Sequence, residues 1–387
     1  MANEKDSVKS LNIRYKAIFA STKKTRIKIL KSQDQIDLEF SKLFYDEYKN
    51  VIVTDRNILA LDILKPVKNY FKDSTKKTQG KTEYELFIKG RHALIVVPAG
   101  EEYKSIDTVL AIVKSGLELS LSRKDTFIAI GGGVLTDITA FAASIYKRGA
   151  QVEFFSTTML GMCDAAIGGK TGCDFDDFKN ITGTFYPARR LIIYLDFVKH
   201  LSEKEYLSGL GEVIKTALLF DPKLYEMLKN EKDRVLKRDT ETLYKIVSRC
   251  VKAKARIVQK DLTEKNQRML LNFGHTFGHA LESRAGLGKL SHGECVIWGI
   301  SRALKLSSTL NLCSKNYYEE VCSLLNSYGY NTDAVHKAFP DSKEILNTMK
   351  NDKKNSGDRI RLILQNALCE NIILEIPDEK ILTALTD

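Results

Sequence analysis

Residues 126–146 read TFIAIGGGVLTDITAFAASIY and decide the fold of the first half of the chain. The run Thr126 to Ile130 is short and apolar, which is typical of a buried strand, and it leads directly into three glycines. From Thr136 to Tyr146 the apolar residues follow helical spacing. A strand, a glycine turn and a helix in this order place free N–H groups and a positive dipole end at the turn. The stretch therefore predicts a phosphate-binding turn in an α/β domain.

Apolar runs elsewhere extend this pattern. Strands are predicted at residues 51–55, 93–97, 151–155 and 191–195, with helical patterns between them, so we expect a parallel sheet. From about Phe197 the spacing is helical, over residues 203–230, 239–260, 274–285, 292–311 and 316–328, and one further strand is predicted at 359–364. We predict a Rossmann-like α/β nucleotide-binding domain over residues 1–196 and a mostly α-helical domain over residues 197–387. Residues 1–22 are expected to be an arm or an added strand, and the Lys-rich segment 72–89 a loop or edge hairpin.

The composition excludes several classes of protein. With 387 residues, 43% hydrophobic and 28% charged, the chain can bury a large core and is not disordered. It contains no apolar run long enough to span a membrane and no signal peptide. Seven scattered cysteines without a C-x-x-C pair predict reduced thiols and a cytoplasmic protein. A net charge of +11 suits nucleic acid, a membrane surface or small anions, and does not choose among them.

The glycine turn alone is a weak nucleotide signal. It departs from G-x-G-x-x-G because Thr136 holds the place of the last glycine, so a plain tight turn is an alternative. Asp55, at the end of an earlier strand, is a candidate for a ribose hydroxyl and equally for a helix N-cap.

The histidines indicate a metal site. The chain has six, and His275, His279 and His292 fall within 18 residues. His275 and His279 are four apart on a helical pattern, so both rings share one face. Two imidazoles and one carboxylate leave an open position on a divalent metal, as a catalytic site needs. The alternative is a set of hydrogen-bonded, partly buried histidines.

Two lysine-bearing segments are unusual because their lysines lie in largely apolar or glycine-rich surroundings. Glu212 and Lys215 are three apart in an otherwise apolar helical segment, where a surface ion pair is the alternative. Lys170 lies in the glycine-rich segment 164–171 (DAAIGGKT), and Lys179 and Asn180 follow soon after. A lysine in such a setting is a candidate ligand for phosphate or carboxylate, although the segment is not a P-loop.

Seven ordered motifs together resemble the 3-dehydroquinate synthase family of the sugar-phosphate cyclase superfamily. The resemblance runs from about Val51 to Leu364. It rests on Gly131-Gly132-Gly133-Val134-x-x-Asp137, Thr157-Thr158 with Asp164, residues 168–172 (GGKTG), Lys179-Asn180, residues 211–215 (GEVIK), residues 272–279 (NFGHTFGH) and residues 292–294 (HGE). The chain departs from the usual family pattern at Thr136, at residues 163–166 (CDAA) and at His200.

The resemblance implies a homodimer that uses NAD and a divalent metal, usually zinc and alternatively cobalt. Its metal ligands would be Glu212, His275 and His292, and His279 would contact substrate, which replaces the pairing of His275 with His279. NAD would be bound by Asp55, Asn57, Glu101, Lys104, Gly132, Gly133, Asp137, Thr157, Thr158, Lys170 and Lys179. Catalytic residues would be Lys170, Lys215, Lys254, His279, Arg268 and Asn272, and substrate would also meet Asp164, Asn180, Lys353 and, from the neighbouring subunit, Arg148.

The implied reaction converts 3-deoxy-D-arabino-heptulosonate 7-phosphate to 3-dehydroquinate and phosphate, in the shikimate pathway. It proceeds by transient oxidation, phosphate elimination, re-reduction and aldol closure. The alternatives are a related cyclase acting on sedoheptulose 7-phosphate, glucose 6-phosphate or an amino analogue, an NAD- and metal-dependent alcohol dehydrogenase, and a nucleotide-binding regulatory protein. Arg268 and Asn272 favour the first, because a guanidinium matches the substrate carboxylate. We expect neither a nucleic-acid nor a membrane partner.

Overall fold

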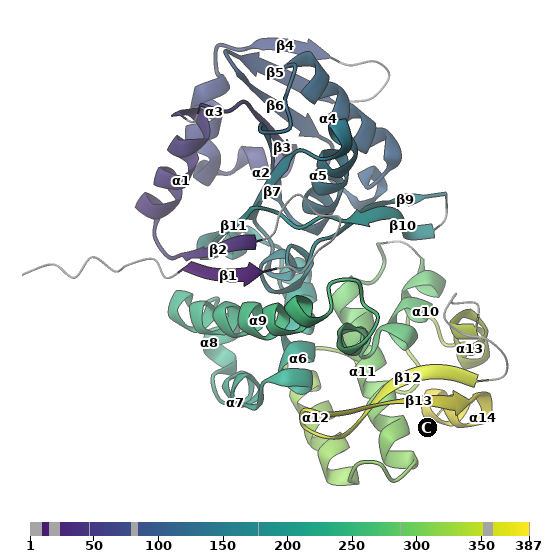
Figure 1. Cartoon of the computed structure of the whole chain (residues 1–387). Coiled ribbons are helices and arrows are strands. Elements are labelled where there is room, and N and C mark those ends of the chain that lie inside the picture. Colours follow the sequence, from purple (N-terminus) through teal and green to yellow (C-terminus); the bar gives the residue numbers. More distant parts are fainter. Residues whose placement is uncertain are drawn as a thin grey trace, which may run out of the picture. The chain divides into compact units, whose positions relative to one another are not determined.

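The computed structural model describes residues 10–14, 24–45, 47–78, 84–176, 178–286, 288–350 and 359–386. The chain forms two compact units (Figure 1). Unit 1 comprises Met1–Leu201 and Leu243–Thr263, and unit 2 comprises Ser202–Thr242 and Glu264–Asp387. Residues 243–263 thus fall with unit 1, although a single boundary at 196/197 was predicted.

Unit 1 is built on a sheet in which the described residues contribute nine strands. Their order is β1 (Ser10–Arg14), β2 (Lys24–Leu30), β11 (Arg190–Tyr194), β8 (Gln151–Ser156), β7 (Thr126–Gly131), β3 (Asn50–Asp55), β6 (His92–Val97), β5 (Glu85–Lys89) and β4 (Thr75–Thr78). The six strands from β2 to β6 in this order are parallel, and β1, β5 and β4 are antiparallel at the edges. This arrangement confirms the predicted parallel sheet.

The central strands form the core of unit 1. β6 and β7 are buried along their whole length, because their apolar sequences face helices on both sides of the sheet. Figure 1 shows α1 and α3 on one side and α4 and α5 on the other. The helices of this unit are α1 (Gln33–Tyr45), α2 (Arg56–Ala60), α3 (Lys65–Phe71), α4 (Ile106–Glu118), α5 (Gly133–Ile145) and most of α9 (Thr240–Lys260).

Two edge segments agree with their predictions where they are described. Residues 10–14 form the added strand β1. Within segment 72–89, β4 and β5 form an edge hairpin, and residues 79–83 lie outside the described structure. A second hairpin, β9 (Lys170–Phe175) and β10 (Phe178–Phe185), was not predicted.

Unit 2 is mostly helical, as predicted. Its helices are α6 (Glu203–Phe220), α7 (Pro222–Asn230), α8 (Lys232–Leu236), α10 (His275–Ala285), α11 (His292–Thr309), α12 (Lys315–Ser327), α13 (Ser342–Lys350) and α14 (Asp378–Thr386). The predicted strand at 359–364 is β12 (Arg359–Ala367), which pairs with β13 (Glu370–Pro377). Trp298 and Arg302 of α11 are buried, so this helix is central to the core of the unit.

Candidate active site and metal centre

The predicted nucleotide residues of unit 1 gather at the carboxyl ends of the parallel strands. β3 lies between β6 and β7 in the sheet. The chain therefore adds β6 on one side of β3 and later adds β7 on the other side. Such a switch point opens a crevice for ligands. Thr54 donates a hydrogen bond to the carbonyl of Ile130 (2.9 Å), and the N–H of Thr157 donates to that of Gly131 (3.0 Å). Asp55, the last residue of β3, therefore lies at the same edge of the sheet as Gly132 and Thr157, which follow β7 and β8.

Position 132 has no room for a side chain, so it requires glycine. It is the N-cap of α5, and a Cβ there would lie 2.8 Å from Cγ2 of Thr158. A larger residue would push the turn away from the 157–158 loop. The close approach leaves the start of α5, from Gly133, accessible to a phosphate.

Asp55 caps the N-terminus of α2, which is one of the two roles predicted for it from the sequence. Its Oδ1 accepts a hydrogen bond from the N–H of Ile58 (2.8 Å) at the start of α2. Asn57 in the same helix and Glu101 after β6 are exposed. A ribose contact by Asp55 stays a prediction.

A buried ion pair lies beside the glycine turn. Lys104 Nζ is 2.7 Å from Oδ2 of Asp137, and only 7% of the lysine side chain is exposed. Burial lowers the pKa of Lys104, but the charges of Asp137 and Glu101 outweigh it and hold the pKa above its ordinary value. The ammonium is therefore charged at neutral pH.

A second ion pair joins Lys254 of α9 to Asp164. Lys254 Nζ donates to the carboxylate Oδ1 at 2.6 Å and to the backbone carbonyl of Asp164 at 2.7 Å. Lys170, Lys179 and Asn180 are exposed on the hairpin β9–β10, where the N–H of Asn180 donates to Asp174 (2.6 Å). Arg148, just after α5, is also exposed.

Unit 2 brings together a carboxylate and three imidazoles. Glu212 comes from α6, His275 and His279 from α10, and His292 from the first turn of α11. Oε1 of Glu212 is 3.8 Å from Nε2 of His275 and 3.5 Å from Nε2 of His292. The ligand atoms of Glu212, His275 and His292 all lie within 4.8 Å of one another, which is the geometry of a metal-binding group.

Close helix packing creates this cluster. Gly293 follows His292, and a Cβ on it would lie 2.1 Å from the backbone oxygen of Ser208 in α6. Only glycine lets α11 approach α6 so closely. Ser291 caps α11 with a reciprocal pair of bonds to Glu294, which fixes where the helix begins. His292 is thereby held opposite Glu212.

The electrostatics of the cluster suit a cation. Burial raises the pKa of Glu212, but Lys215, in ion-pair contact with it, and His292 lower it to about 2. Burial lowers the pKa of His292, but Glu212 and Glu282 raise it to about 9. Burial, with the charge of Lys215, holds the pKa of His275 well below its ordinary value. Glu212 is thus ionised and His275 neutral, as metal ligands must be.

The donor set fits a divalent metal. Glu212 is 1% exposed. Its Oε2 is in ion-pair contact with Lys215, whereas its Oε1 faces the imidazoles of His275 and His292 at 3.8 and 3.5 Å without a well-formed hydrogen bond among the described residues. His275 Nδ1 lies 3.2 Å from the carbonyl of Phe273, so with its proton on Nδ1 the ring presents Nε2 toward Glu212. A buried carboxylate oxygen without a close hydrogen bond is costly, so a cation bound between Oε1 and the two rings would stabilise it.

Sequence reasoning missed two carboxylates. Oε2 of Glu282 is 3.6 Å from Nδ1 of His292, and Oε1 of Glu264 accepts a hydrogen bond from Asn272 (2.5 Å). Glu282 follows His275 and His279 at helical spacing, so its place on their face was readable from the sequence. Arg268 is buried in the short 3-10 helix η6 (Gln267–Asn272) that carries Asn272. Lys353 lies outside the described residues.

Comparisons with known proteins cover both halves of the chain. Residues 94–208 match the 3-dehydroquinate synthase N-terminal family, and residues 209–355 match the C-terminal family. The chain belongs to the 3-dehydroquinate synthase family. A 3-dehydroquinate synthase of Acidithiobacillus ferrooxidans is 39% identical over 75% of this chain and 79% of its own length. That of Campylobacter hominis is 34% identical over 92% of this chain and 99% of its own.

Solved structures share the fold of the 3-dehydroquinate synthase family. The 2-epi-5-epi-valiolone synthase of Streptomyces hygroscopicus, with NAD+ and Zn2+ bound, has a TM-score of 0.79 at 24% identity, covering 93% of this chain and 95% of its own. A 2-deoxy-scyllo-inosose synthase complexed with carbaglucose-6-phosphate, NAD+ and Co2+ has a TM-score of 0.79 at 20% identity, covering 97% and 99%. The family models and the relatives at 34–39% identity, rather than these structures, show that the chain is an enzyme of the phosphate-eliminating cyclase type, a lyase of the shikimate pathway that forms 3-dehydroquinate.

Proposed function

We propose that the chain performs this reaction on 3-deoxy-D-arabino-heptulosonate 7-phosphate with Glu212, His275 and His292 holding a divalent zinc or cobalt ion. The observation that carries the assignment is the convergence of their ligand atoms within 4.8 Å around a buried carboxylate. A glutamate and two imidazoles leave a coordination position open for a substrate hydroxyl. His279, exposed beside them, is assigned to substrate contact.

NAD is assigned to unit 1. The glycine turn and the start of α5 would hold its diphosphate through Gly132 and Gly133, and Asp55 and Asn57 its ribose. The other proposed contacts are Glu101, Lys104, Asp137, Thr157, Thr158, Lys170 and Lys179. When bound, NAD and the metal supply reversible oxidation of the alcohol and Lewis-acid activation of its oxygen.

Cationic side chains are proposed to hold the two anionic groups of the substrate. Arg268 is buried and Asn272 is beside it on η6, so the pair can bind the carboxylate in a water-poor site. We assign the remaining contacts to Lys170, Lys215, Lys254, Asp164, Asn180 and Lys353. Lys215, 2% exposed, places its side-chain nitrogen in ion-pair contact with Glu212 of the metal cluster.

We further propose a homodimer in which Arg148 reaches the substrate phosphate of the partner subunit. Its support is that Arg148 is exposed and is held in a left-handed backbone conformation, φ 63°. Sedimentation and subunit mixing of Arg148→Ala with a catalytically dead variant test this. A cytoplasmic location is supported by the seven cysteines, none of which forms a disulfide in the described structure. Among the described residues, no helix has the length and hydropathy required to cross a bilayer.

The direct test is phosphate release from 3-deoxy-D-arabino-heptulosonate 7-phosphate by purified protein with NAD and zinc. The product is identified by coupling to dehydroquinate dehydratase. We expect phosphate and 3-dehydroquinate with no lasting NADH. Release from sedoheptulose 7-phosphate or glucose 6-phosphate instead would contradict the substrate assignment, and lasting NADH would indicate a dehydrogenase.

A further inference from the structure

A basic pocket lies at the amino ends of the parallel strands of unit 1, the edge opposite the predicted nucleotide residues. It consists of two cavities of about 310 and 440 Å³ that share Lys42, Arg189 and Arg190. The larger cavity is lined by six residues, and all six are basic: Lys24, Arg26, Lys28, Lys42, Arg189 and Arg190. Along β8 the two edges are separated by roughly 17 Å at ~3.3 Å per residue. The pocket is therefore distinct from the NAD-binding residues proposed above.

Alternation of basic and buried residues along β2 places the basic side chains on the pocket side of the strand. Within residues 24–28 (KTRIK), the side chains of Lys24, Arg26 and Lys28 share one face of β2, while Thr25 and Ile27 are buried on the other. Arg190 begins β11 in register with Arg26 of β2 on one side and with Glu153 of β8 on the other. The cations of two neighbouring parallel strands thus lie in one row.

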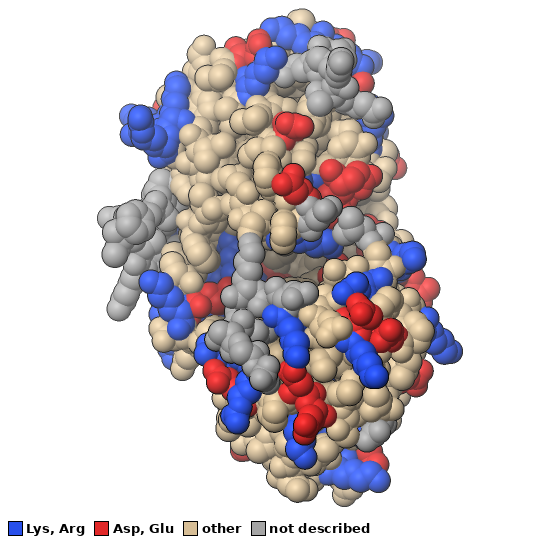
Figure 2. All heavy atoms as spheres, turned by 90° about the vertical axis from the view of Figure 1, so that its right-hand side faces the viewer, with Lys and Arg blue, Asp and Glu red and all other residues tan. Residues whose placement is uncertain are grey.

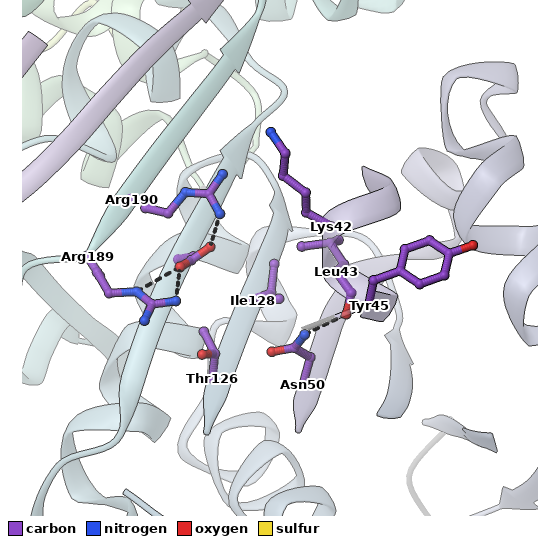
Figure 3. A pocket seen from close by; sticks show the side chains of 9 residues that line it. Lys42, Leu43, Tyr45, Asn50, Thr126, Ile128, Arg189 and Arg190 are labelled. Carbon is purple, nitrogen blue, oxygen red and sulfur yellow. Dashed lines mark hydrogen bonds and ion pairs between the residues drawn. The ribbon is translucent and has the colours of Figure 1, made fainter. Parts of the chain in front are cut away.

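Two buried carboxylates anchor four of these cations. Glu39 of α1, 3% exposed, is paired with Lys28 (2.8 Å), Lys42 (2.9 Å) and Arg190. Burial raises the pKa of Glu39, but the lysine hydrogen bonds and the charge of Arg190 hold it below its ordinary value. Glu153, 2% exposed, accepts from Arg189 at 2.8 Å and lies 3.3 Å from Arg190. Figure 3 shows Arg189 and Arg190 side by side on one acidic side chain, with Lys42 extending from the helix.

The cations exceed what the carboxylates neutralise. Lys24 and Arg26 are exposed and form no ion pair with any described residue. Six cations around two carboxylates leave a formal excess of four positive charges in one pocket. Mutual repulsion makes such a group unfavourable unless an anion joins it. The face in Figure 2, by contrast, shows basic and acidic side chains interspersed.

We propose that this pocket binds a small soluble anion carrying two or more phosphate groups. Guanidinium groups held in place by Glu153 and Glu39 keep N–H donors for phosphate oxygens, and the lysines add charge. The cavity size is that of a small-molecule site. The inference goes beyond the synthase reaction and does not depend on its site assignments.

The test is calorimetric titration of the full chain with pyrophosphate at low salt. The double variant Lys24→Gln/Arg26→Gln removes the two unpaired cations from exposed positions, and Lys114→Gln/Lys124→Gln removes two exposed lysines elsewhere in unit 1 as the matched control. We expect binding at least tenfold weaker in the first variant and unchanged in the control, with hydrogen-exchange protection at residues 24–30 and 189–194. Thermal unfolding of both variants verifies the fold.

Three results would overturn the proposal. They are no pyrophosphate binding, equal affinity in the two double variants, and protection confined to the strand ends that carry Asp55, Gly131 and Thr157. If pyrophosphate does not bind, a duplex oligonucleotide and phosphoinositide vesicles are tested next. Binding of either one through Lys24 and Arg26 would assign the pocket to a macromolecular or membrane partner instead.

Discussion

Lys254 and Asp164, 90 positions apart in the chain, are joined by two hydrogen bonds from one ammonium group. The lysine side chain is 8% exposed and the carboxylate 23%, so the pair is screened only partly by water. It ties α9 to the short π-helix η4 (Gly161–Ala165), which follows β8 within unit 1. Both residues are also proposed to meet substrate, so the contact positions two site residues at once.

We expect this pair to show strong energetic coupling. In a double-mutant cycle of Lys254→Met and Asp164→Asn, the coupling should be about 1–3 kcal/mol, because each single change removes one partner of a largely buried ion pair. Denaturant unfolding of the four proteins measures it. The exposed pair Lys229 and Glu320 is the matched control and should show little coupling, because water screens it. Additive effects of Lys254→Met and Asp164→Asn would show that the contact is not formed in solution.

Replacing Glu212 with Gln should greatly reduce zinc content. The amide keeps the shape but loses the charge that the two histidines face, so affinity should fall by more than the roughly 10–100-fold typical of residues outside the ligand set. Metal analysis after dialysis, with chelator competition, gives the number. Glu226→Gln in α7 of the same unit is the control, since it is exposed. Undiminished zinc in Glu212→Gln would eliminate this ligand set.

Glu282 should strengthen zinc binding by orienting the ring of His292. Its carboxylate is 3.6 Å from Nδ1, so it favours the ring form whose Nε2 lone pair faces Glu212. We expect Glu282→Ala to weaken zinc binding about 10–100-fold and Glu282→Gln, whose side-chain oxygen can still accept from Nδ1, to weaken it less. Chelator competition distinguishes the two. Equal, unchanged affinities would mean that Glu282 does not orient the ring.

Zinc binding should release a proton near neutral pH. In the metal-free protein the pKa of His292 is about 9, above its value of about 6.5 in an unfolded chain, so the ring is protonated at pH 7.5. A ligand imidazole must be neutral, so apparent affinity should rise about tenfold per pH unit from 7 to 9. The same raised pKa stabilises the metal-free fold below about pH 6.5, and this contribution is lost as pH rises through 9. Calorimetry in buffers of different ionisation enthalpy measures the number of protons released on zinc binding. A zinc affinity that does not change with pH would contradict the prediction.

Asp55 allows its two roles to be separated. Serine caps helices about as well as aspartate, so Asp55→Ser should preserve stability to within a few tenths of a kcal/mol, whereas Asp55→Ala should cost about 1 kcal/mol. If Asp55 also binds the ribose, both variants should weaken NAD binding. Thermal unfolding and NAD titration measure the two properties. Normal NAD affinity in Asp55→Ser would leave the residue as a cap alone.

The amino-acid sequence by itself determined the local elements and which residues share a face. Buried parallel strands have continuous apolar runs, as at 126–130, and helical spacing places His275 and His279 together. The hairpin β9–β10 was missed because its residues are largely polar and exposed, especially in β10, and therefore have no apolar period. Motif order alone was sufficient to identify the family.

Tertiary structure decided which side chains from distant parts of the chain face one another. Glu212 meets His292 only because α6 and α11 pack closely at Gly293, a contact between residues 80 positions apart that no local period encodes. The basic pocket arises in the same way, since the register of β11 between β2 and β8 aligns Arg26, Arg190 and Glu153. Sequence periodicity reports which side of an element a residue occupies, whereas the partner on that side is set by packing between elements.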